Sequence, residues 1–228
     1  MLITFSGLDG AGKSTLIAWL ADSLQRQYGR PVVVFHMNDH VGIYAYIRKL
    51  RNLLLGERQP EPHPLVVEER RLTEHRARTP RTALRDALRY LRYRIIWNAT
   101  LRRVIYPIDL VVFLCYRTYN ERVKGRVLIM DRYFYDTLVD VSTNRRAWAA
   151  RMLERITPTP TLPIYLDISP EESFARKGEY SVEYLRRRRE AYRRVVSWIP
   201  SYVVIATSDL EASKAVLYRA TIDRLGVW

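Results

Sequence analysis

A glycine-rich segment near the start of the chain constrains its fold more than any other feature. Residues 7–14 read GLDGAGKS, which matches the spacing G-x-x-x-x-G-K-[ST] in full. The apolar run 2–6 precedes this segment. An amphipathic stretch follows it, with apolar residues at helical spacing: Leu16, Ile17, Leu20 and Leu24. A strand, a glycine-rich turn and a helix in this order predict a phosphate-binding loop.

The residue types in this loop indicate what it binds. Glycines let the backbone curl so that several N–H groups point at phosphate oxygens, and the N-terminus of the following helix adds its positive end. Lys13 is placed to reach the β- and γ-phosphates, and the Ser14 hydroxyl to bind Mg²⁺. We therefore predict a site for a nucleoside triphosphate and Mg²⁺ with these nucleotide-binding residues: Gly7, Gly10, Ala11, Gly12, Lys13, Ser14 and Thr15. The motif alone does not separate a kinase from a mechanical ATPase.

The rest of the chain alternates apolar runs with amphipathic stretches, which is typical of an α/β protein with a parallel sheet. Further strands are predicted at 31–35, 126–132, 163–169 and 202–208, and helices at 41–55, 181–198 and 209–225. Residues 108–116 read as a strand or a buried helix, and we favour a helix because Lys124-Gly125 supplies the turn before the next strand. The prediction is one domain over 1–228, with a mostly helical insertion at about 57–125 that opens with a proline-rich stretch.

Composition limits the function classes. With 48% apolar and 27% charged residues the chain is not intrinsically disordered. Its net charge of +14, from 38 Lys+Arg and 24 Asp+Glu, suggests anionic ligands such as nucleotides, phosphorylated metabolites or nucleic acid, and an Arg-rich proteome or a hot habitat explains it equally well. Cys115 is the single cysteine, so neither an intrachain disulfide nor a Cys-based zinc site is expected. The chain shows no signal-peptide pattern and no apolar run near the roughly 18 residues of a membrane span, so a cytoplasmic protein is expected.

A second candidate motif closes the apolar run before residue 131. Asp131 is placed at the end of a parallel strand, where it would orient Mg²⁺-bound water or the attacking group. Arg132 would project into the same cleft and hold an acceptor phosphate by a bidentate contact. Tyr133 and Tyr135 follow, and each is equally compatible with packing on the acceptor or in the core. Asp167 also ends a predicted strand, and we interpret it as structural.

The segments GLDGAGKST, IMDRY, LPIYLDISPEESFAR and the Arg-rich helix ending in REAY run in order over nearly the whole chain. In this order they resemble the thymidylate kinase family of nucleoside monophosphate kinases. The resemblance implies a three-layer P-loop kinase fold, in which a five-stranded parallel sheet carries helices on both faces and a short lid lies at about 176–182. It also implies ATP as phosphoryl donor, Mg²⁺ as cofactor and a possible homodimer.

The resemblance also implies roles for single residues. Asp9 would contact the acceptor sugar, Arg51 would lie on the acceptor side, and Arg176 at the start of the lid would pack against the adenine. Asn38 follows the second predicted strand, where an acceptor would lie. The resulting candidates are Lys13, Asp131 and Arg176 for catalysis, Ser14 and Asp131 for the metal, and Asp9, Asn38, Arg51, Arg132 and Tyr133 for the acceptor. Within the Arg-rich helix, Arg187 and Arg189 would face the cleft, and Arg186 and Arg188 the solvent.

The predicted reaction is phosphoryl transfer from ATP to a nucleoside monophosphate, with dTMP as the first candidate. Residues 36–39 read HMND where the family carries an Arg-Glu-Pro-Gly run. Together with the short lid and the long middle segment, this departure predicts weak dTMP turnover and a distinct preferred acceptor. The alternatives are a kinase for a sugar or phosphosugar and a nucleic-acid-associated ATPase. Only the net charge supports the ATPase alternative, so nucleic acid is not expected as a partner. A membrane is not expected as a partner either.

Overall fold

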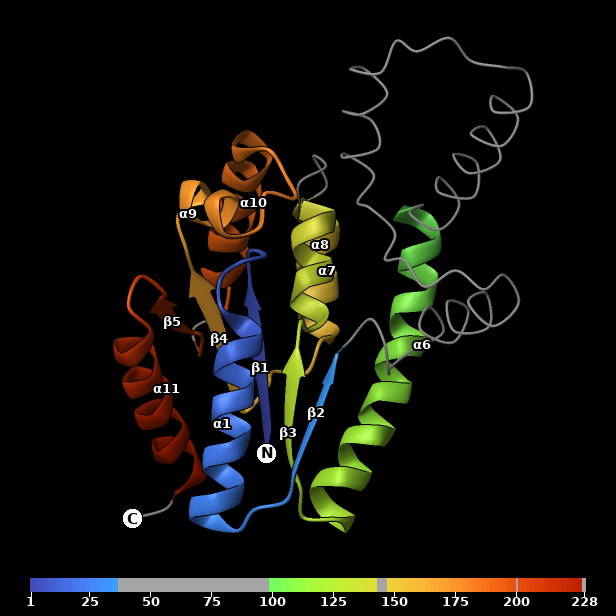
Figure 1. Cartoon of the computed structure of the whole chain (residues 1–228). Helices are drawn as coiled ribbons and strands as arrows, with labels where there is room; N and C mark the ends of the chain where they lie inside the picture. Colours follow the sequence, from blue (N-terminus) through green and yellow to red (C-terminus); the bar gives the residue numbers. More distant parts are fainter. Residues whose placement is uncertain (37–98, 143–146, 200, 227–228) are drawn as a thin grey trace, which may run out of the picture.

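The computed structural model describes residues 1–36, 99–142, 147–199 and 201–226 (Figure 1). The predicted helix at 41–55, the proline-rich stretch and the candidates Asn38 and Arg51 lie outside these ranges. The insertion and lid boundaries stay predictions.

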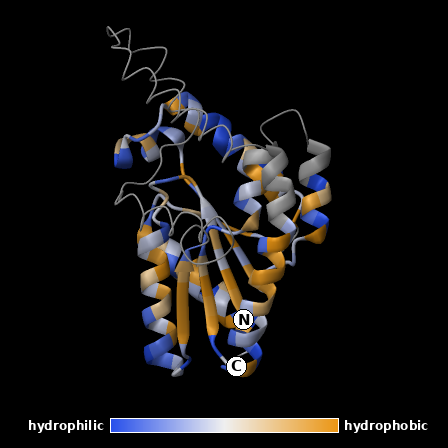
Figure 2. Cartoon of the chain, turned by 90° about the vertical axis from the view of Figure 1, so that its right-hand side faces the viewer, coloured by the Kyte–Doolittle hydropathy of each residue, from blue (hydrophilic) through white to orange (hydrophobic). Residues whose placement is uncertain are grey.

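The centre of the fold is one sheet of five parallel strands in the order β2-β3-β1-β4-β5. The strands are β1 (Leu2–Gly7), β2 (Val32–His36), β3 (Val127–Asp131), β4 (Leu162–Asp167) and β5 (Val203–Ala206). β1 and β3 are buried along their whole length, and the sheet appears as hydrophobic arrows in Figure 2. Near-continuous apolar runs of this kind are typical of parallel strands covered on both faces. The predicted α/β class and five-stranded parallel sheet are confirmed.

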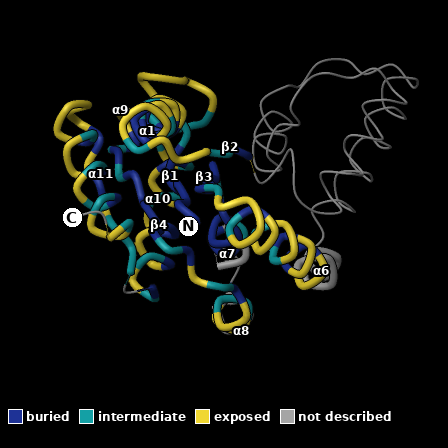
Figure 3. Tube along the Cα trace, turned by 90° about the horizontal axis from the view of Figure 1, so that it is seen from below, coloured by how far each residue is buried: buried dark blue, intermediate teal, exposed yellow. Residues whose placement is uncertain are grey.

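Helices cover both faces of the sheet (Figure 3). α1 (Lys13–Tyr28) and α11 (Leu210–Leu225) lie on one face, and α6 (Ala99–Thr118) and α7 (Phe134–Ser142) lie on the other. The predicted apolar stripe of α1 is buried, and Gly29 ends the helix with a left-handed φ of 60°. α1 therefore begins directly behind the glycine-rich loop, as the motif requires.

The segment 108–116 lies within α6, so the helix favoured from the sequence is confirmed. Leu110 and Phe113 are buried on one side of this helix, and the Phe113 ring lies 6.2 Å from that of Phe35 on β2. A π-helical turn, η1 (Tyr119–Val123), then leads into β3. Among the described helices, none is both long and apolar enough to cross a membrane.

The remaining helices stand above the carboxyl ends of the strands or beside them: α8 (Ala147–Ile156), α9 (Pro170–Lys177) and α10 (Val182–Val196). Ser169 caps α9 by accepting a hydrogen bond from the Glu172 N–H, and Gly178 ends it with φ 62°. Ser181 caps α10 by accepting from the Tyr184 N–H. Residues 178–181 thus form a tight turn between two capped helices. The lid predicted at about 176–182 would include this turn.

Candidate functional site

The candidate site lies where the carboxyl ends of β1, β2 and β3 meet. The strand register pairs Asp131 with Phe5 on one side and with His36 on the other. After β1 the chain forms β2 and β3 on one side of this strand and then β4 and β5 on the other, so β1 lies at the topological switch point of the sheet. Ligands of open α/β sheets bind at such a switch point. The sheet therefore brings the end of IMDRY beside the glycine-rich loop.

Close backbone packing explains why this loop needs glycine. Gly7 has φ 147°, and a Cβ atom there would lie 2.6 Å from the carbonyl oxygen of Leu166. Gly10 and Gly12 have φ values of 85° and 81°. The Ser173 hydroxyl donates to the Asp9 carbonyl at 2.6 Å, so α9 holds the loop from above. The loop is a fixed cradle between β4 and α9.

Lys13 is buried inside this cradle at the start of α1. Its Nζ donates to the carbonyls of Gly7 at 3.0 Å and Leu8 at 2.8 Å, and lies 3.8 Å from Asp9 Oδ1. Burial and the neighbouring Arg132 charge lower the pKa of Lys13, against the opposing effect of Asp9. Ser14 is exposed beside it. The loop thus offers a cation and a solvent-facing hydroxyl to a phosphate ligand.

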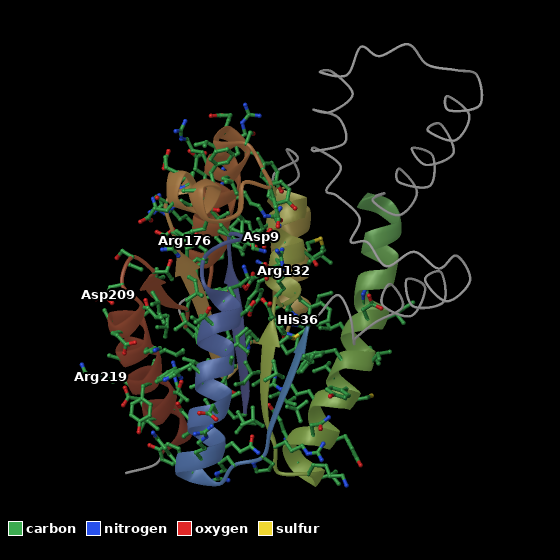
Figure 4. All side chains as sticks on the ribbon, viewed as in Figure 1. Asp9, His36, Arg132, Arg176, Asp209 and Arg219 are labelled. Carbon is green, nitrogen blue, oxygen red and sulfur yellow. The ribbon has the colours of Figure 1, made fainter. Side chains whose placement is uncertain are left out.

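Arg132 and Asp9 form an ion pair across the site. Figure 4 labels the two residues near each other at the carboxyl ends of the strands. Nη2 of Arg132 donates to Asp9 Oδ1. Burial alone would raise the pKa of Asp9, but the charges of Arg132, Lys13 and Arg188 lower it. Burial alone would lower the pKa of Arg132, but the negative charge of Asp9 outweighs burial, and the pKa of Arg132 is raised overall. Both partners are therefore charged.

The backbone of Arg132 is strained. Its φ is 62°, the one positive value at a non-glycine residue in the described part of the chain. A left-handed conformation costs an L-residue roughly 1–2 kcal/mol. The Arg132 N–H donates to the Phe5 carbonyl at 2.9 Å, which holds the residue in this conformation and points its side chain at the loop. Strain that the surrounding structure maintains in this way is frequent at functional sites.

Asp131 is the predicted metal-binding carboxylate of the site. Its Oδ2 lies 3.0 Å from Nδ1 of His36, whereas its Oδ1 is buried and has no hydrogen-bond partner among the described residues. An unsatisfied buried carboxylate oxygen is costly, so this oxygen is available to a ligand. Mg²⁺ is usually held by one or two side-chain oxygens together with substrate phosphates and water. Among the described residues, no group of three or more His, Cys, Asp or Glu would cage a metal. The oxygens of Asp131 and of the exposed Ser14 hydroxyl are of the type that would share Mg²⁺ with a bound nucleotide.

Four predicted residues come together in this way: Asp9, Lys13, Asp131 and Arg132. Arg176 lies on the opposite side of the loop, where its Nη1 donates to the Gly10 carbonyl at 3.2 Å and its Nη2 to the Thr207 carbonyl at 3.3 Å.

The structure corrects the expected role of Tyr133 as an acceptor-binding residue. Its side chain is 0% exposed, and its hydroxyl donates to the Pro158 carbonyl at 2.6 Å. Its ring packs edge-on against Phe113 and Phe134. The polar end of this tyrosine is satisfied inside the core, so the side chain does not reach a ligand.

Sequence reasoning missed Asp136, which organises the floor of the site. This buried carboxylate accepts hydrogen bonds from the Ser6 hydroxyl at 2.9 Å, the Tyr133 N–H at 3.0 Å and the Tyr192 hydroxyl. It thereby ties the segment after Asp131 to β1 and α10. An acidic residue in the first turn of a helix that follows Asp-Arg was the available signal, since helix N-termini favour acidic side chains.

The Arg-rich helix is also oriented differently from the prediction. Arg187 has a side chain 72% exposed and pairs with Glu183, so it does not face the site. Arg189 binds Asp167 rather than an open cleft. Arg188 is the half-buried arginine whose charge acts on Asp9 and Arg132.

The fold and the loop define a P-loop α/β protein of the kinase type, and comparisons with known proteins agree. No protein-family model matches the chain. It is 30% identical over 185 residues to a thymidylate kinase of Chlorobium luteolum, covering 78% of this chain and 66% of the relative. It is 26% identical over 203 residues to a probable thymidylate kinase of Archaeoglobus fulgidus, covering 84% and 80%. A thymidylate kinase of Nitrosomonas eutropha is 51% identical over 57 residues, a quarter of each chain.

The chain is therefore similar to thymidylate kinases over most of its length and diverges from them in sequence. It spans just under two thirds of the Chlorobium luteolum relative.

Proposed function

We propose that the protein is a Mg²⁺- and ATP-dependent nucleoside monophosphate kinase. One observation carries this proposal: the buried Lys13 of the glycine-rich loop, the Asp9–Arg132 ion pair and the unsatisfied Asp131 oxygen lie at one edge of the sheet. A phosphate-binding loop facing a separate arginine is the arrangement that transfer between two phosphorylated substrates needs, because each substrate requires its own cation.

The donor side follows from the loop. When ATP binds, the Lys13 ammonium exchanges the Gly7 and Leu8 carbonyls for phosphate oxygens and offsets their charge. Arg176, held over the loop by Gly10 and Thr207, lies on the donor side of the site. Mg²⁺ would be held by the Ser14 hydroxyl and Asp131, and it supplies further charge neutralisation on the phosphates.

The acceptor side follows from Arg132. The Asp9 carboxylate now occupies the guanidinium, as an acceptor phosphate would. An entering phosphate takes over this contact and releases Asp9 to accept a hydrogen bond from an acceptor hydroxyl. An oxygen of the acceptor phosphate then bonds to the γ-phosphorus, the bond from that phosphorus to the β–γ bridging oxygen breaks, and ADP leaves with the electron pair. A phosphate monoester is largely ionised near pH 7, so this step needs no strong general base.

The acceptor itself is the finer part of the proposal. The names of the relatives make dTMP the first nucleotide to test. The HMND segment begins at His36, which contacts Asp131 where the family carries the start of an Arg-Glu-Pro-Gly run. One lost charge-assisted contact weakens binding by a factor of about ten to a hundred, so we expect dTMP to be a poor acceptor and another monophosphate to be preferred.

A coupled ADP-release assay tests the proposal. The purified chain is supplied with Mg-ATP and, one at a time, with nucleoside monophosphates, phosphosugars, free sugars or polynucleotide. Turnover with at least one nucleoside monophosphate and none with free sugars is expected. Turnover with phosphosugars alone, or ATP hydrolysis stimulated only by polynucleotide, would contradict it. Omission of Mg²⁺ should abolish turnover.

A further inference from the structure

α10 carries a row of side chains that no assigned role accounts for. Tyr184, Arg188 and Tyr192 follow one another at spacings of four residues, which places them on one face of the helix. Nη1 of Arg188 donates to the Tyr184 hydroxyl at 3.1 Å, and its guanidinium carbon lies 5.6 Å from the centre of the Tyr192 ring. Tyr184 in turn stacks on Tyr180 of the lid turn, with ring centres 4.9 Å apart. Tyr184 and Tyr192 thus both contact the Arg188 guanidinium.

This row leads into the candidate site. The Tyr192 hydroxyl donates to Asp136, and Asp136 binds the N–H of Tyr133, the residue directly after Arg132. Arg188 is therefore anchored through Tyr192 to the segment that positions Arg132. The charge of Arg188 contributes to the low pKa of Asp9 and opposes the raised pKa of Arg132, which agrees with its placement beside that ion pair.

The neighbouring arginines of the helix point elsewhere. Arg186 and Arg187 are exposed and pair with Glu183, and Arg189 binds Asp167 at the end of β4. Successive helical residues differ in direction by about 100°, so only one member of the run can share the face of Tyr184 and Tyr192. That member is Arg188.

We propose that Arg188 and Arg132 together bind the phosphate group of the acceptor. This inference rests on the proposed function and adds a second guanidinium to its acceptor site. A phosphate monoester carries about 1.5 to 2 negative charges at pH 7, so it is matched by two guanidinium groups and not by one. In the present structure the Asp9 carboxylate pairs with Arg132, and the charge of Arg188 acts on the same carboxylate. A dianion that displaces Asp9 meets both cations.

Substitutions at adjacent positions test the inference. Arg188→Met keeps an apolar stem against Tyr192 and removes the charge, Arg188→Lys keeps the charge and loses the planar fork, and Arg187→Met is the matched control on the same helix. Loss of one charge-assisted contact predicts that Arg188→Met raises the KM and Kd of dTMP about 10- to 100-fold. Arg188→Lys should recover part of this loss. Arg187→Met should match the wild type, and Kd for Mg-ADP and for thymidine should stay unchanged in all three variants.

A second measurement separates this inference from the kinase proposal. Inorganic phosphate is titrated into each protein with Mg-ADP present, and the rise in melting temperature reports phosphate binding. Wild type and Arg187→Met should rise alike, and Arg188→Met should rise less. If no nucleoside monophosphate is turned over but this difference persists, the kinase proposal fails and the anion-binding role of Arg188 stands. Identical responses of Arg188→Met and Arg187→Met to both dTMP and phosphate, or an equal loss of Mg-ADP binding in Arg188→Met, would overturn the role of Arg188.

Discussion

Two carboxylate–arginine clusters lie at the same edge of the sheet and differ in how completely their charges are satisfied. At the end of β4, Asp167 accepts hydrogen bonds from Arg189 at 2.6 and 2.9 Å and from Arg193 at 2.9 Å, and the Tyr165 hydroxyl donates to it at 3.2 Å. Both oxygens are occupied by protein groups, and the backbone of these residues is regular. This cluster fastens α10 to β4.

The cluster at the ends of β1 and β3 is arranged differently. Lys13, Arg132 and Arg188 all act on the single carboxylate of Asp9, Arg132 is held at positive φ, and the adjoining Asp131 has an oxygen without a partner among the described residues. Three cations thus act on one carboxylate that one of them, Arg132, already pairs with, and the predicted metal-binding oxygen of Asp131 has no protein partner in the described residues. The comparison teaches that the number of arginine contacts does not identify a site. A strained backbone next to a buried carboxylate oxygen without a hydrogen-bond partner is the better indication.

The largest expected effect comes from removing the cation inside the loop. Lys13→Ala should lower the rate of phosphoryl transfer by roughly 10²–10³-fold or more, because its charge offset acts on the transferring group in a site shielded from water. ADP release under saturating substrates measures this loss, and the melting temperature checks that the variant is folded. A folded Lys13→Ala protein with near-normal turnover would remove the basis for calling the β1 cluster catalytic.

A pair of substitutions at Arg132 separates its charge from its strain. Arg132→Ala and Arg132→Gly should both raise the KM of the acceptor about 10- to 100-fold and leave the KM of ATP unchanged, since the guanidinium serves only one substrate. Glycine adopts φ 62° freely and alanine does not, so the glycine variant should be more stable by about 1 kcal/mol. Denaturant unfolding measures the difference. If the two variants are equally stable, the backbone at Arg132 is not strained; if the ATP KM rises instead, the two substrates are placed the wrong way round.

The sequence predicted the β1 cluster better than the elements that support it. The loop was predictable because an apolar strand, a spaced motif and an amphipathic helix agree locally over the first 28 residues. The helices α7 and α8 were not expected. α7 begins with aromatic residues and carries several β-branched ones, which favour strands, and its packing against α10 decides its structure instead.

The orientation of the Arg-rich helix shows a second limit. Four consecutive arginines carry no periodicity of their own, so the residues that face inward depend on the neighbouring apolar positions. Leu185, Tyr192 and Val195 are buried, and Arg188 lies at helical spacing from each of them, which is a signal that this stripe would have given. Whether Tyr133 meets a ligand or the core depends on the distant residue Pro158, and no local pattern contains that information.

A smaller effect is expected from the satisfied cluster. Asp167→Asn should destabilise the fold by about 1–3 kcal/mol and leave both KM values unchanged, because it weakens the charged hydrogen bonds of Arg189 and Arg193 without touching the site. Burial would raise the pKa of Asp167, but hydrogen bonds from these two arginines lower it overall. Because the pKa of Asp167 is lower in the folded state, its ionisation stabilises the fold fully at pH values above the unfolded pKa of about 3.9. This stabilisation is lost as the pH falls through the folded-state pKa.

The free energy of unfolding should therefore differ most between wild type and Asp167→Asn at pH 7, and the difference should shrink below about pH 4. Chemical denaturation across this pH range measures it. A large rise in the acceptor KM of this variant would show that the two clusters are not separate in function.

The smallest effect concerns Thr4, which tests whether an unsatisfied atom alone marks a site. Its hydroxyl is buried in the middle of β1 and, like Asp131 Oδ1, has no hydrogen-bond partner in the described part of the chain. Valine has nearly the same shape and removes the unsatisfied group, so Thr4→Val should leave stability unchanged or raise it by up to about 1 kcal/mol, with unaltered kinetics. Thr4 lies between the buried apolar residues Ile3 and Phe5 of β1, whereas Asp131 precedes Arg132 and its charge acts on Lys13. If Thr4→Val reduces turnover while the protein stays folded, that distinction fails, and the unsatisfied hydroxyl would have to be counted as part of the site.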